Sequence, residues 1–178
     1  MRVRRNVREA KSSPPNFTFL FPVVNKSALR DAVLVQLRSD LAQQTRAAWL
    51  ARDEATNEES RAENKYDTRG QEAAYLAEGQ ARLAAEIDES ISQYAAMPLP
   101  IFSPGDSIAL GAVVELTGRR GSAWYFLGPR AGGTEVKLGE RTVMIVTPIS
   151  PLGRQLIGKM LSDSVAMSGG SQRILAVE

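Results

Sequence analysis

Residues 58–70 read EESRAENKYDTRG, a stretch in which charged side chains are frequent and apolar ones are scarce. Sequence of helical character lies on both sides of it, so the stretch is interpreted as a polar connection between two helices. We expect it to form the exposed tip of a helical hairpin. Its concentration of acids and bases indicates a tip that contacts another molecule.

The segment that leads into this tip, from Ser27 to Ser60, contains no glycine or proline. Ser27 is the predicted N-cap, and Asp31 supplies an acid to the opening turn. Apolar or small residues recur at three- and four-residue spacing, which is typical of one strand of a coiled coil. They are Leu34, Leu37, Leu41, Ala48, Ala51 and Ala55, with Gln44 in the same row.

A second helix is predicted from about Gln71, and Pro98 and Pro100 end it. Its predicted apolar face carries Leu76, Leu83, Ile87, Ile91 and Tyr94. Neither helix can bury its stripe alone, so the two are expected to fold back on each other as an antiparallel coiled-coil hairpin. The first arm, from Ser27 to Ser60, would be about 50 Å long, and its tip would stand in solvent.

The C-terminal region changes from helical to strand periodicity. Its apolar segments are β-branched or aromatic and are separated by glycine-rich turns, so they are predicted to be antiparallel strands. These segments are 108–116, 123–129, 141–148 and 172–178. Between the last two, Ser150 can cap and Pro151 can open a short helix that carries Leu152, Leu156 and Ile157 toward a core. The predicted fold class is α+β.

Two features of this region have an ordinary structural interpretation. Trp124, Tyr125 and Phe126 are consecutive on a predicted strand, so alternate rings must face opposite sides of the sheet. The glycines of GPRAGGTE (128–135) superficially suggest a phosphate loop, but no helix follows and the lysine-serine ending of a P-loop is missing. A hairpin turn is the expected structure.

Composition restricts the chemistry that this chain can perform. The 178 residues include no cysteine and no histidine, and the net charge is only +2. Disulfides, thiolate zinc sites and cysteine or histidine catalysis are therefore excluded, and the net charge alone does not indicate a nucleic-acid partner. Catalysis by this chain would have to use carboxylates, lysine or a borrowed metal ion.

The predicted organisation has four parts. Residues 1–24 are basic, then carry a Ser-Pro-Pro break and a short apolar patch, FTFLFPVV. They are interpreted as a disordered tail or an upstream extension of the reading frame, because the patch is too short and lacks the cleavage site of a targeting segment. Residues 25–97 form the predicted hairpin, 98–107 a proline-bearing linker, and 108–178 the C-terminal domain.

Two motifs, taken in this order, resemble the GreA/GreB family of transcription elongation factors. The stretch RTVMIVTPISPLGRQLIGKMLSDSVAM (141–167) is similar to the C-terminal end of that family, and AENKYDTRGQEAAYLAEGQ (62–80) is similar to its hairpin tip and returning helix. The resemblance spans about residues 27–178 and points to a less studied Gre-like subgroup. It implies an FKBP-like C-terminal domain and a cytoplasmic, monomeric protein. Prolyl isomerase activity does not follow from such a fold, because function belongs to a site.

The resemblance also implies a partner and a mechanism. Members of the family bind bacterial RNA polymerase, insert the hairpin into its secondary channel, and meet transcript RNA and DNA only through the elongation complex. Acids at the tip help to hold a magnesium ion shared with the polymerase active centre, which stimulates cleavage of backtracked transcripts. Such a protein is an accessory factor and not an enzyme. Mg²⁺ prefers carboxylate oxygens and needs no histidine or cysteine, so the composition is compatible with this role.

The tip of this chain departs from the family pattern at one position. Glu63 and Asn64 match the family's Glu-Asn pair, whereas its Asp falls on Ser60. Glu59 or Asp67 could supply the second carboxylate, and the predicted magnesium-facing residues are Glu63, then Glu59, then Asp67. Predicted contacts with the polymerase are Asn64, Arg61, Lys65 and Arg69. The competing interpretation is that these charged residues are solvated and make helix-face pairs, such as Glu58 with Arg61.

Two further interpretations remain open. With Ser60 in place of the acid, the protein could occupy the channel as a regulator that does not stimulate cleavage. A coiled-coil adaptor unrelated to transcription would show the same hairpin pattern.

Overall fold

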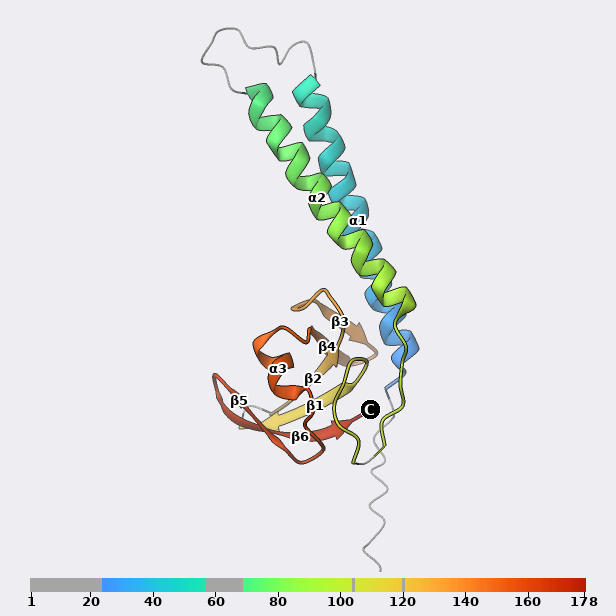
Figure 1. The fold of residues 1–178 in the computed structure, drawn as a ribbon, viewed down its shortest axis with the longest axis vertical. Coiled ribbons are helices and arrows are strands. Elements are labelled where there is room, and N and C mark those ends of the chain that lie inside the picture. The colour runs from blue at the N-terminus through green and yellow to red at the C-terminus, as the bar shows by residue number, and fades with distance from the viewer. Residues whose placement is uncertain (1–23, 57–68, 104, 120) are drawn as a thin grey trace, which may run out of the picture.

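The computed structural model describes residues 24–56, 69–103, 105–119 and 121–178. Two long helices precede a six-stranded sheet that carries one short helix (Figure 1). The elements are α1 (Lys26–Thr56), α2 (Arg69–Ala96), β1 (Val113–Gly118), β2 (Gly121–Leu127), β3 (Glu135–Leu138), β4 (Arg141–Val146), α3 (Pro151–Leu156), β5 (Ser164–Met167) and β6 (Gly170–Val177). The predicted α+β fold class is confirmed.

Helices α1 and α2 lie side by side as an antiparallel hairpin that projects away from the sheet (Figure 1). Helix α1 begins one residue before Ser27, and its N-cap is Asn25, whose Oδ1 accepts a hydrogen bond from the Ala28 backbone N–H at 3.0 Å. The predicted cap Ser27 instead donates its hydroxyl to the same oxygen. The cap prediction was therefore wrong by two residues, because Asn25 reaches the free backbone donor first.

The seam between the helices agrees with the prediction on α1 and differs on α2. All seven predicted α1 positions are buried or half-buried. On α2, however, Leu76 and Leu83 are exposed. The seam there consists of Ala73, Ala77, Gln80 and Ala84 on the outer part of the helix, followed by Ile87, Ile91 and Tyr94 toward the sheet. The prediction followed the largest apolar residues, whereas a closely packed helix pair can use alanine at the contact.

The sheet is mixed, which corrects the expected antiparallel arrangement. Its strand order is β3-β4-β2-β1-β6-β5. Four neighbouring pairs are antiparallel, but β2 and β4 run parallel, with Trp124 opposite Val143. The predicted hairpin turn at 128–135 is consequently wrong. This segment carries the chain to β3 at the sheet edge, and β4 then returns between β3 and β2.

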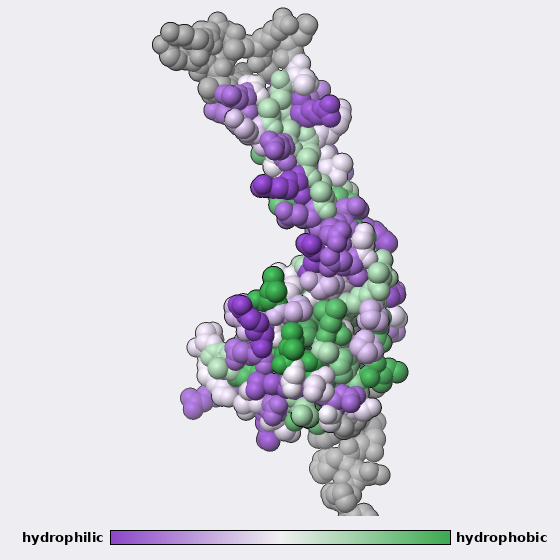
Figure 2. Space-filling view, viewed as in Figure 1, coloured by the Kyte–Doolittle hydropathy of each residue, from purple (hydrophilic) through white to green (hydrophobic). Residues whose placement is uncertain are grey.

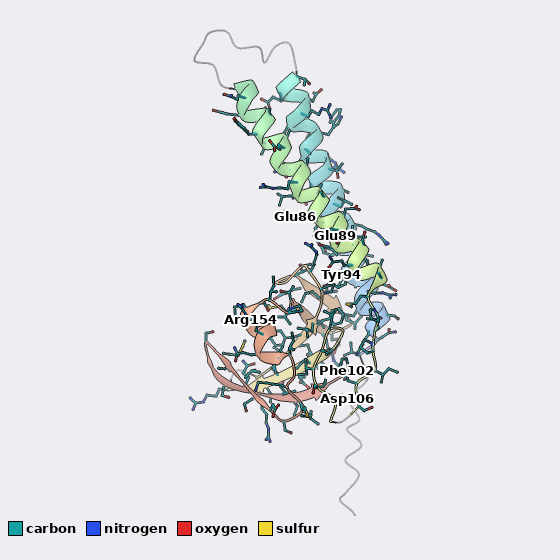
Figure 3. The ribbon with its side chains drawn as sticks, in the orientation of Figure 1. Glu86, Glu89, Tyr94, Phe102, Asp106 and Arg154 are labelled. Atoms are coloured by element: carbon teal, nitrogen blue, oxygen red, sulfur yellow. The ribbon has the colours of Figure 1, made fainter. Side chains whose placement is uncertain are left out.

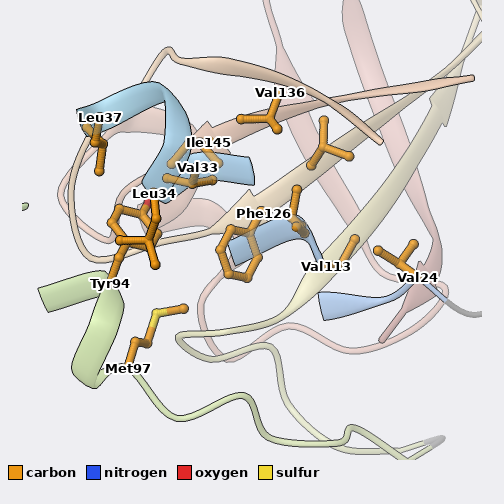
Figure 4. Packing of buried hydrophobic residues seen from close by; sticks show 12 residues of the cluster. Val24, Val33, Leu34, Leu37, Tyr94, Met97, Val113, Phe126, Val136 and Ile145 are labelled. Carbon is orange, nitrogen blue, oxygen red and sulfur yellow. The ribbon is translucent and has the colours of Figure 1, made fainter. Parts of the chain in front are cut away.

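The sheet has a hydrophobic core on each face. On one face, Phe126, Val143 and Ile145 pack against Leu29 and Val33 of α1, together with Tyr94 and Met97 at the end of α2 (Figure 4). On the other face, residues such as Tyr125 pack with Leu156 of α3. The three consecutive aromatic residues thus alternate between faces as predicted, with Trp124 and Phe126 on the first face. The base of the hairpin is part of the core of the sheet.

Helix α3 begins as the sequence predicts. Ser150 is the N-cap, its Oγ accepts the Gly153 N–H at 3.0 Å, and Pro151 occupies the first turn. Leu156 is buried as expected, but Ile157 is exposed because the helix ends at Leu156. A β-carbon on Gly153 would lie 1.9 Å from the Thr147 carbonyl oxygen, so the glycine of this motif allows the close approach of helix and strand.

Candidate functional site at the hairpin end and its anchor

The predicted catalytic and polymerase-contact residues belong to the segment that joins the two helices. Glu59, Glu63 and Asp67, as well as Arg61, Asn64 and Lys65, lie outside the described residues, and so does Ser60. Arg69 is the first residue of α2. The described parts of the chain place the end of α1 and the start of α2 next to each other, at the end of the hairpin farthest from the sheet (Figure 1).

Within the described ranges, no group of three or more acidic, histidine or cysteine residues could hold a metal ion. The prediction of a tip metal site depends on Glu63 and Glu59 and is therefore not tested by this structure. At the far end of α1, the Thr56 hydroxyl donates to the carbonyl oxygens of Arg52 and Asp53.

Tyr94 anchors the hairpin to the sheet. Its ring is fully buried and lies 6.5 Å from the Phe126 ring, centroid to centroid. Its hydroxyl donates a hydrogen bond of 2.8 Å to the Arg130 carbonyl oxygen. Burial raises the pKa of Tyr94 above its ordinary value, so the hydroxyl remains a donor at physiological pH. Figure 3 shows Tyr94 on α2 at the level of the sheet, with Glu86 and Glu89 farther along the arm.

Gly128 completes this anchor. A β-carbon there would lie 2.1 Å from the Tyr94 hydroxyl oxygen, which is far inside van der Waals contact. The Gly128 backbone N–H also donates to the Val146 carbonyl oxygen at 2.9 Å. The absence of a side chain at residue 128 is therefore what allows the hydroxyl to reach the loop after β2.

Glu178 holds the start of α1. The Glu178 carboxylate accepts the Val24 backbone N–H, while the Glu178 backbone exchanges two hydrogen bonds of 2.9 Å with Val113. Lys26 donates to the Pro100 carbonyl oxygen at 2.6 Å and lies 4.5 Å from the Phe102 ring centroid. Desolvation lowers the pKa of Lys26 to about 8, against the opposing effect of the nearby Glu178 carboxylate.

The segment 98–107 also packs against the molecule at this end. Leu99 and Phe102 are half-buried, each against one of the two cores. A β-carbon on Gly111 would lie 2.9 Å from the Pro100 Cδ atom, so the proline-bearing segment runs close to the turn before β1. The base of the hairpin is thus attached through its helices, Glu178 and this segment.

A groove of about 870 Å³ lies where the arm leaves the sheet. The hairpin wall of this groove includes Leu37, Leu83 and Ile87, and the sheet wall includes Ile145 and the exposed Ile149. Its charged lining residues are Asp40, Glu86 and Arg130. The groove is therefore lined by apolar side chains together with several polar and charged ones, which is the mixed lining common in binding sites.

Sequence reasoning identified the hairpin but not the residues that anchor it. Tyr94 was predicted only as a seam residue, and nothing in the pattern indicated Gly128 or Glu178. One signal was present: Tyr94 is the only aromatic residue in the predicted α2 seam and is close to the prolines that end the helix. An aromatic residue with a polar end, at the boundary of a helix, often joins two structural elements.

No protein-family model matches this chain, and no curated protein sequence matches it. Solved structures do match. They include GreA factor homolog 1 (Gfh1) of Thermus thermophilus. That structure has 23% sequence identity and a TM-score of 0.34, and the match covers 85% of this chain and 93% of Gfh1.

Two further matches carry similar names. Gfh1 of Thermus aquaticus has 24% identity and a TM-score of 0.32, and the match covers 86% of this chain and 94% of that one. The prokaryotic transcription elongation factor GreA/GreB of Nitrosomonas europaea has 18% identity and a TM-score of 0.31, covering 60% and 91% of the two chains. These names agree with the family that the sequence motifs resemble.

Proposed function

We propose that this protein is a Gre-like transcription elongation factor that binds RNA polymerase and inserts its hairpin into the secondary channel. The observation that carries the proposal is mechanical. Tyr94, Phe126 and α1 residues such as Leu29 fix the hairpin base in the core of the sheet, while the far ends of the helices project away from it. A protein built in this way can dock through its C-terminal part and deliver the 57–68 segment into a cavity of its partner.

The tip would then supply the chemistry. Glu63, with Glu59 or Asp67, would face the magnesium ion shared with the polymerase active centre and stimulate cleavage of backtracked transcripts. Mg²⁺ is bound through one or two carboxylates and keeps several waters, so two tip acids suffice when the polymerase provides the rest. Asn64, Arg61, Lys65 and Arg69 would contact the walls of the channel.

One sequence observation favours a second function. Ser60 occupies the position at which the family has an Asp, and a serine hydroxyl does not provide the charge that a carboxylate gives to a magnesium site. If neither Glu59 nor Asp67 replaces it, the protein occupies the channel and regulates the polymerase without stimulating cleavage.

A transcript-cleavage assay on backtracked elongation complexes tests the proposal. The wild-type protein is compared with Glu63→Ala, Glu59→Ala and Asp67→Ala, and Glu89→Ala on the arm is the matched control. Cleavage that is stimulated by the wild type, lost in Glu63→Ala and retained in Glu89→Ala is the expected result. Binding of each variant to core polymerase is measured in parallel, so that a loss of chemistry is distinguished from a loss of binding.

Each outcome has a defined meaning. Binding without cleavage stimulation, combined with inhibition of an authentic cleavage factor, identifies the regulator. If Ser60→Asp then stimulates cleavage, the serine at residue 60 is the reason why the wild type does not. A wild-type protein that does not bind core polymerase contradicts both functions and leaves the coiled-coil adaptor.

A further inference from the structure

The outer arm exposes large apolar side chains that its own seam does not use. They are Trp49, Leu50, Tyr75, Leu76 and Leu83. Hydrophobic residues lie between hydrophilic ones along the arm in Figure 2. A helical hairpin in water normally carries polar residues outside its seam, so apolar side chains that gather on one side of the arm mark a candidate contact surface.

The groove shows which side of the hairpin faces the sheet. Asp40 of α1 and Leu83 and Glu86 of α2 line it together. Residues seven apart on a coiled-coil helix lie on the same side, so this side continues outward from Leu83 to Leu76 and from Asp40 to Ala47. Leu50, three residues after Ala47, is on the same side, and Gly79, where a β-carbon would meet nothing within 4 Å, lies between the two leucines. We call Ala47, Leu50, Leu76, Gly79 and Leu83 the inner window.

Acidic residues mark both ends of the inner window. Asp40 and Glu86 lie at the groove end, and Glu54 lies on the same side near the end of α1. From residue 33 to 56 and from 69 to 93, the positions of this side carry four acids, Asp40, Glu54, Glu72 and Glu86, and one base, Arg69, which is the first residue of α2. The other basic residues of the same part of the arm, Arg38, Arg46, Arg52 and Arg82, fall at other helix positions.

This charge pattern indicates which kind of molecule could cover the inner window. A second copy that covered the inner window with its own would bring two acidic surfaces together, since the acids of this side outnumber Arg69 four to one, and this is unfavourable. A partner with an apolar stripe and basic ends would bury the leucines and pair its cations with the acids. Asp40 and Glu54 are separated by two heptads, which is a rise of about 21 Å. Basic residues about fourteen positions apart on a helix would match them.

We infer that the inner window is a docking surface for an amphipathic helix of a protein partner, with leucine-like residues on one face and lysine or arginine at both ends. The groove end of this helix would meet Ile149, which is 80% exposed on the opposite wall. The inference does not depend on the proposed function, because it concerns the side of the arm and not the 57–68 segment.

The full chain provides matched variants for a test. Leu50 and Trp49 are sequence neighbours with 56% and 64% exposure, and Leu76 and Tyr75 are neighbours with 55% and 68% exposure. The leucines belong to the inner window, whereas the adjacent aromatic residues are turned by about 100° around the helix. Leu76→Ser and Leu50→Ser therefore remove the proposed contacts, and Tyr75→Ser and Trp49→Ser remove as much exposed apolar surface elsewhere.

The probe is a fluorescent synthetic helix of about eighteen residues, held helical by side-chain lactam bridges because short isolated helices are marginal. It carries leucines at three- and four-residue spacing and two lysines at each end, and a second version carries glutamates at the ends. We expect the lysine-ended helix to bind to the wild type. Leu76→Ser and Leu50→Ser should each lower the affinity for this helix by about tenfold. Tyr75→Ser and Trp49→Ser should change binding by less than about twofold, and circular dichroism verifies that every variant is folded.

Three results would overturn the inference. Equal losses in the leucine and aromatic variants would mean unspecific adhesion to any apolar residue. Equal binding of the glutamate-ended helix would exclude recognition by charge. Sedimentation of the unliganded chain as a dimer that Leu76→Ser dissociates would assign the inner window to a second copy. Polymerase binding by Leu76→Ser and Glu63→Ala is measured separately, so failure here and failure of the proposed function are distinguishable.

Discussion

The hairpin base and the outer arm are made of the same two helices, but they are packed by different means. At the base, Leu29, Val33 and Tyr94 are fully buried against the sheet. On the arm, the seam consists largely of alanine, as at Ala51 and Ala73, and larger apolar residues face outward. Apolar area removed from water contributes roughly 25 cal/mol per Å², so large buried side chains concentrate stability at the base.

The difference separates two tasks. The base has dense packing that fixes the direction of the hairpin, and substitutions there should be costly. The seam of the arm is made largely of small residues and buries little apolar area, so the arm is stabilised mainly by its connection to the base. Most of the surface of the arm is therefore available for other roles. The following predictions test this division, from the largest expected effect to the smallest.

Phe126→Ala should cost about 3–5 kcal/mol in the free energy of unfolding, because it leaves a cavity between the sheet and the hairpin base. Leu76→Ala on the arm removes an exposed side chain and should change stability by less than about 0.5 kcal/mol. Urea denaturation followed by circular dichroism measures both. Similar values for the two variants would remove the distinction between base and arm.

Gly128→Ala should destabilise the protein by about 1–3 kcal/mol, because its β-carbon would overlap the Tyr94 hydroxyl. The same substitution in a Tyr94→Phe background should cost clearly less, since the overlapping oxygen is gone. A double-mutant cycle from denaturation curves measures this coupling. Additive effects would show that the two residues do not form one anchor.

Tyr94→Phe alone should cost about 1 kcal/mol, because the hydrogen bond to the Arg130 carbonyl oxygen is lost. Tyr75→Phe, on the exposed surface of the same helix, is the matched control and should be nearly neutral. Thermal unfolding of the two variants at one protein concentration provides the comparison. An equal shift of the melting temperature in both would contradict the anchoring role.

Gly79→Ala should stabilise the arm by about 0.5–1 kcal/mol, because glycine is a poor helix former and a β-carbon there meets nothing within 4 Å. Hydrogen exchange of the α2 amides, which reports local opening, is expected to slow in the variant. Unchanged exchange would mean that helix propensity does not limit the stability of the arm.

The smallest effect is expected from Lys26, whose pKa is lowered from 10.5 to about 8 by desolvation. Because this side chain is only half-buried, screening by solvent should keep its contribution to stability well below what the pKa shift alone would give. Between these two pH values the unfolded chain keeps the proton that the folded chain has released, so the free energy of unfolding should rise with pH. The difference between wild type and Lys26→Met, followed from pH 7 to pH 11, isolates this contribution. A difference that falls or stays constant across this range would contradict it.

Much of the fold could be predicted from the sequence, because its signals are local. Periodicity identified both helices, Pro98 marked the end of the second, and Ser150 with Pro151 identified the start of α3. The strands that the pattern missed, β3 and β5, are four residues each and lie at the edges of the sheet. Such short segments provide little periodicity to detect.

The errors have a common physical cause, which is that pairing depends on contacts distant in sequence. Local pattern did not distinguish a hairpin turn at Gly132 from a passage to the sheet edge, and so it missed the parallel pairing of β2 with β4. It also assigned Leu76 to the seam, because size was the criterion, whereas the partner helix decides which face is covered. The tip acids, including Glu63, remain predictions.

The buried attachment of α1 up to Leu37 has a geometric consequence for the rest of the hairpin. From Leu37 to Thr56 the helix rises about 28 Å, so a rotation of about 5° at the attachment would displace the far end by about 2.5 Å. That displacement is comparable to the length of a metal–oxygen bond. A conservative substitution in the contact between α1 and the sheet would thus displace the far end of the hairpin, even with every residue at that end unchanged.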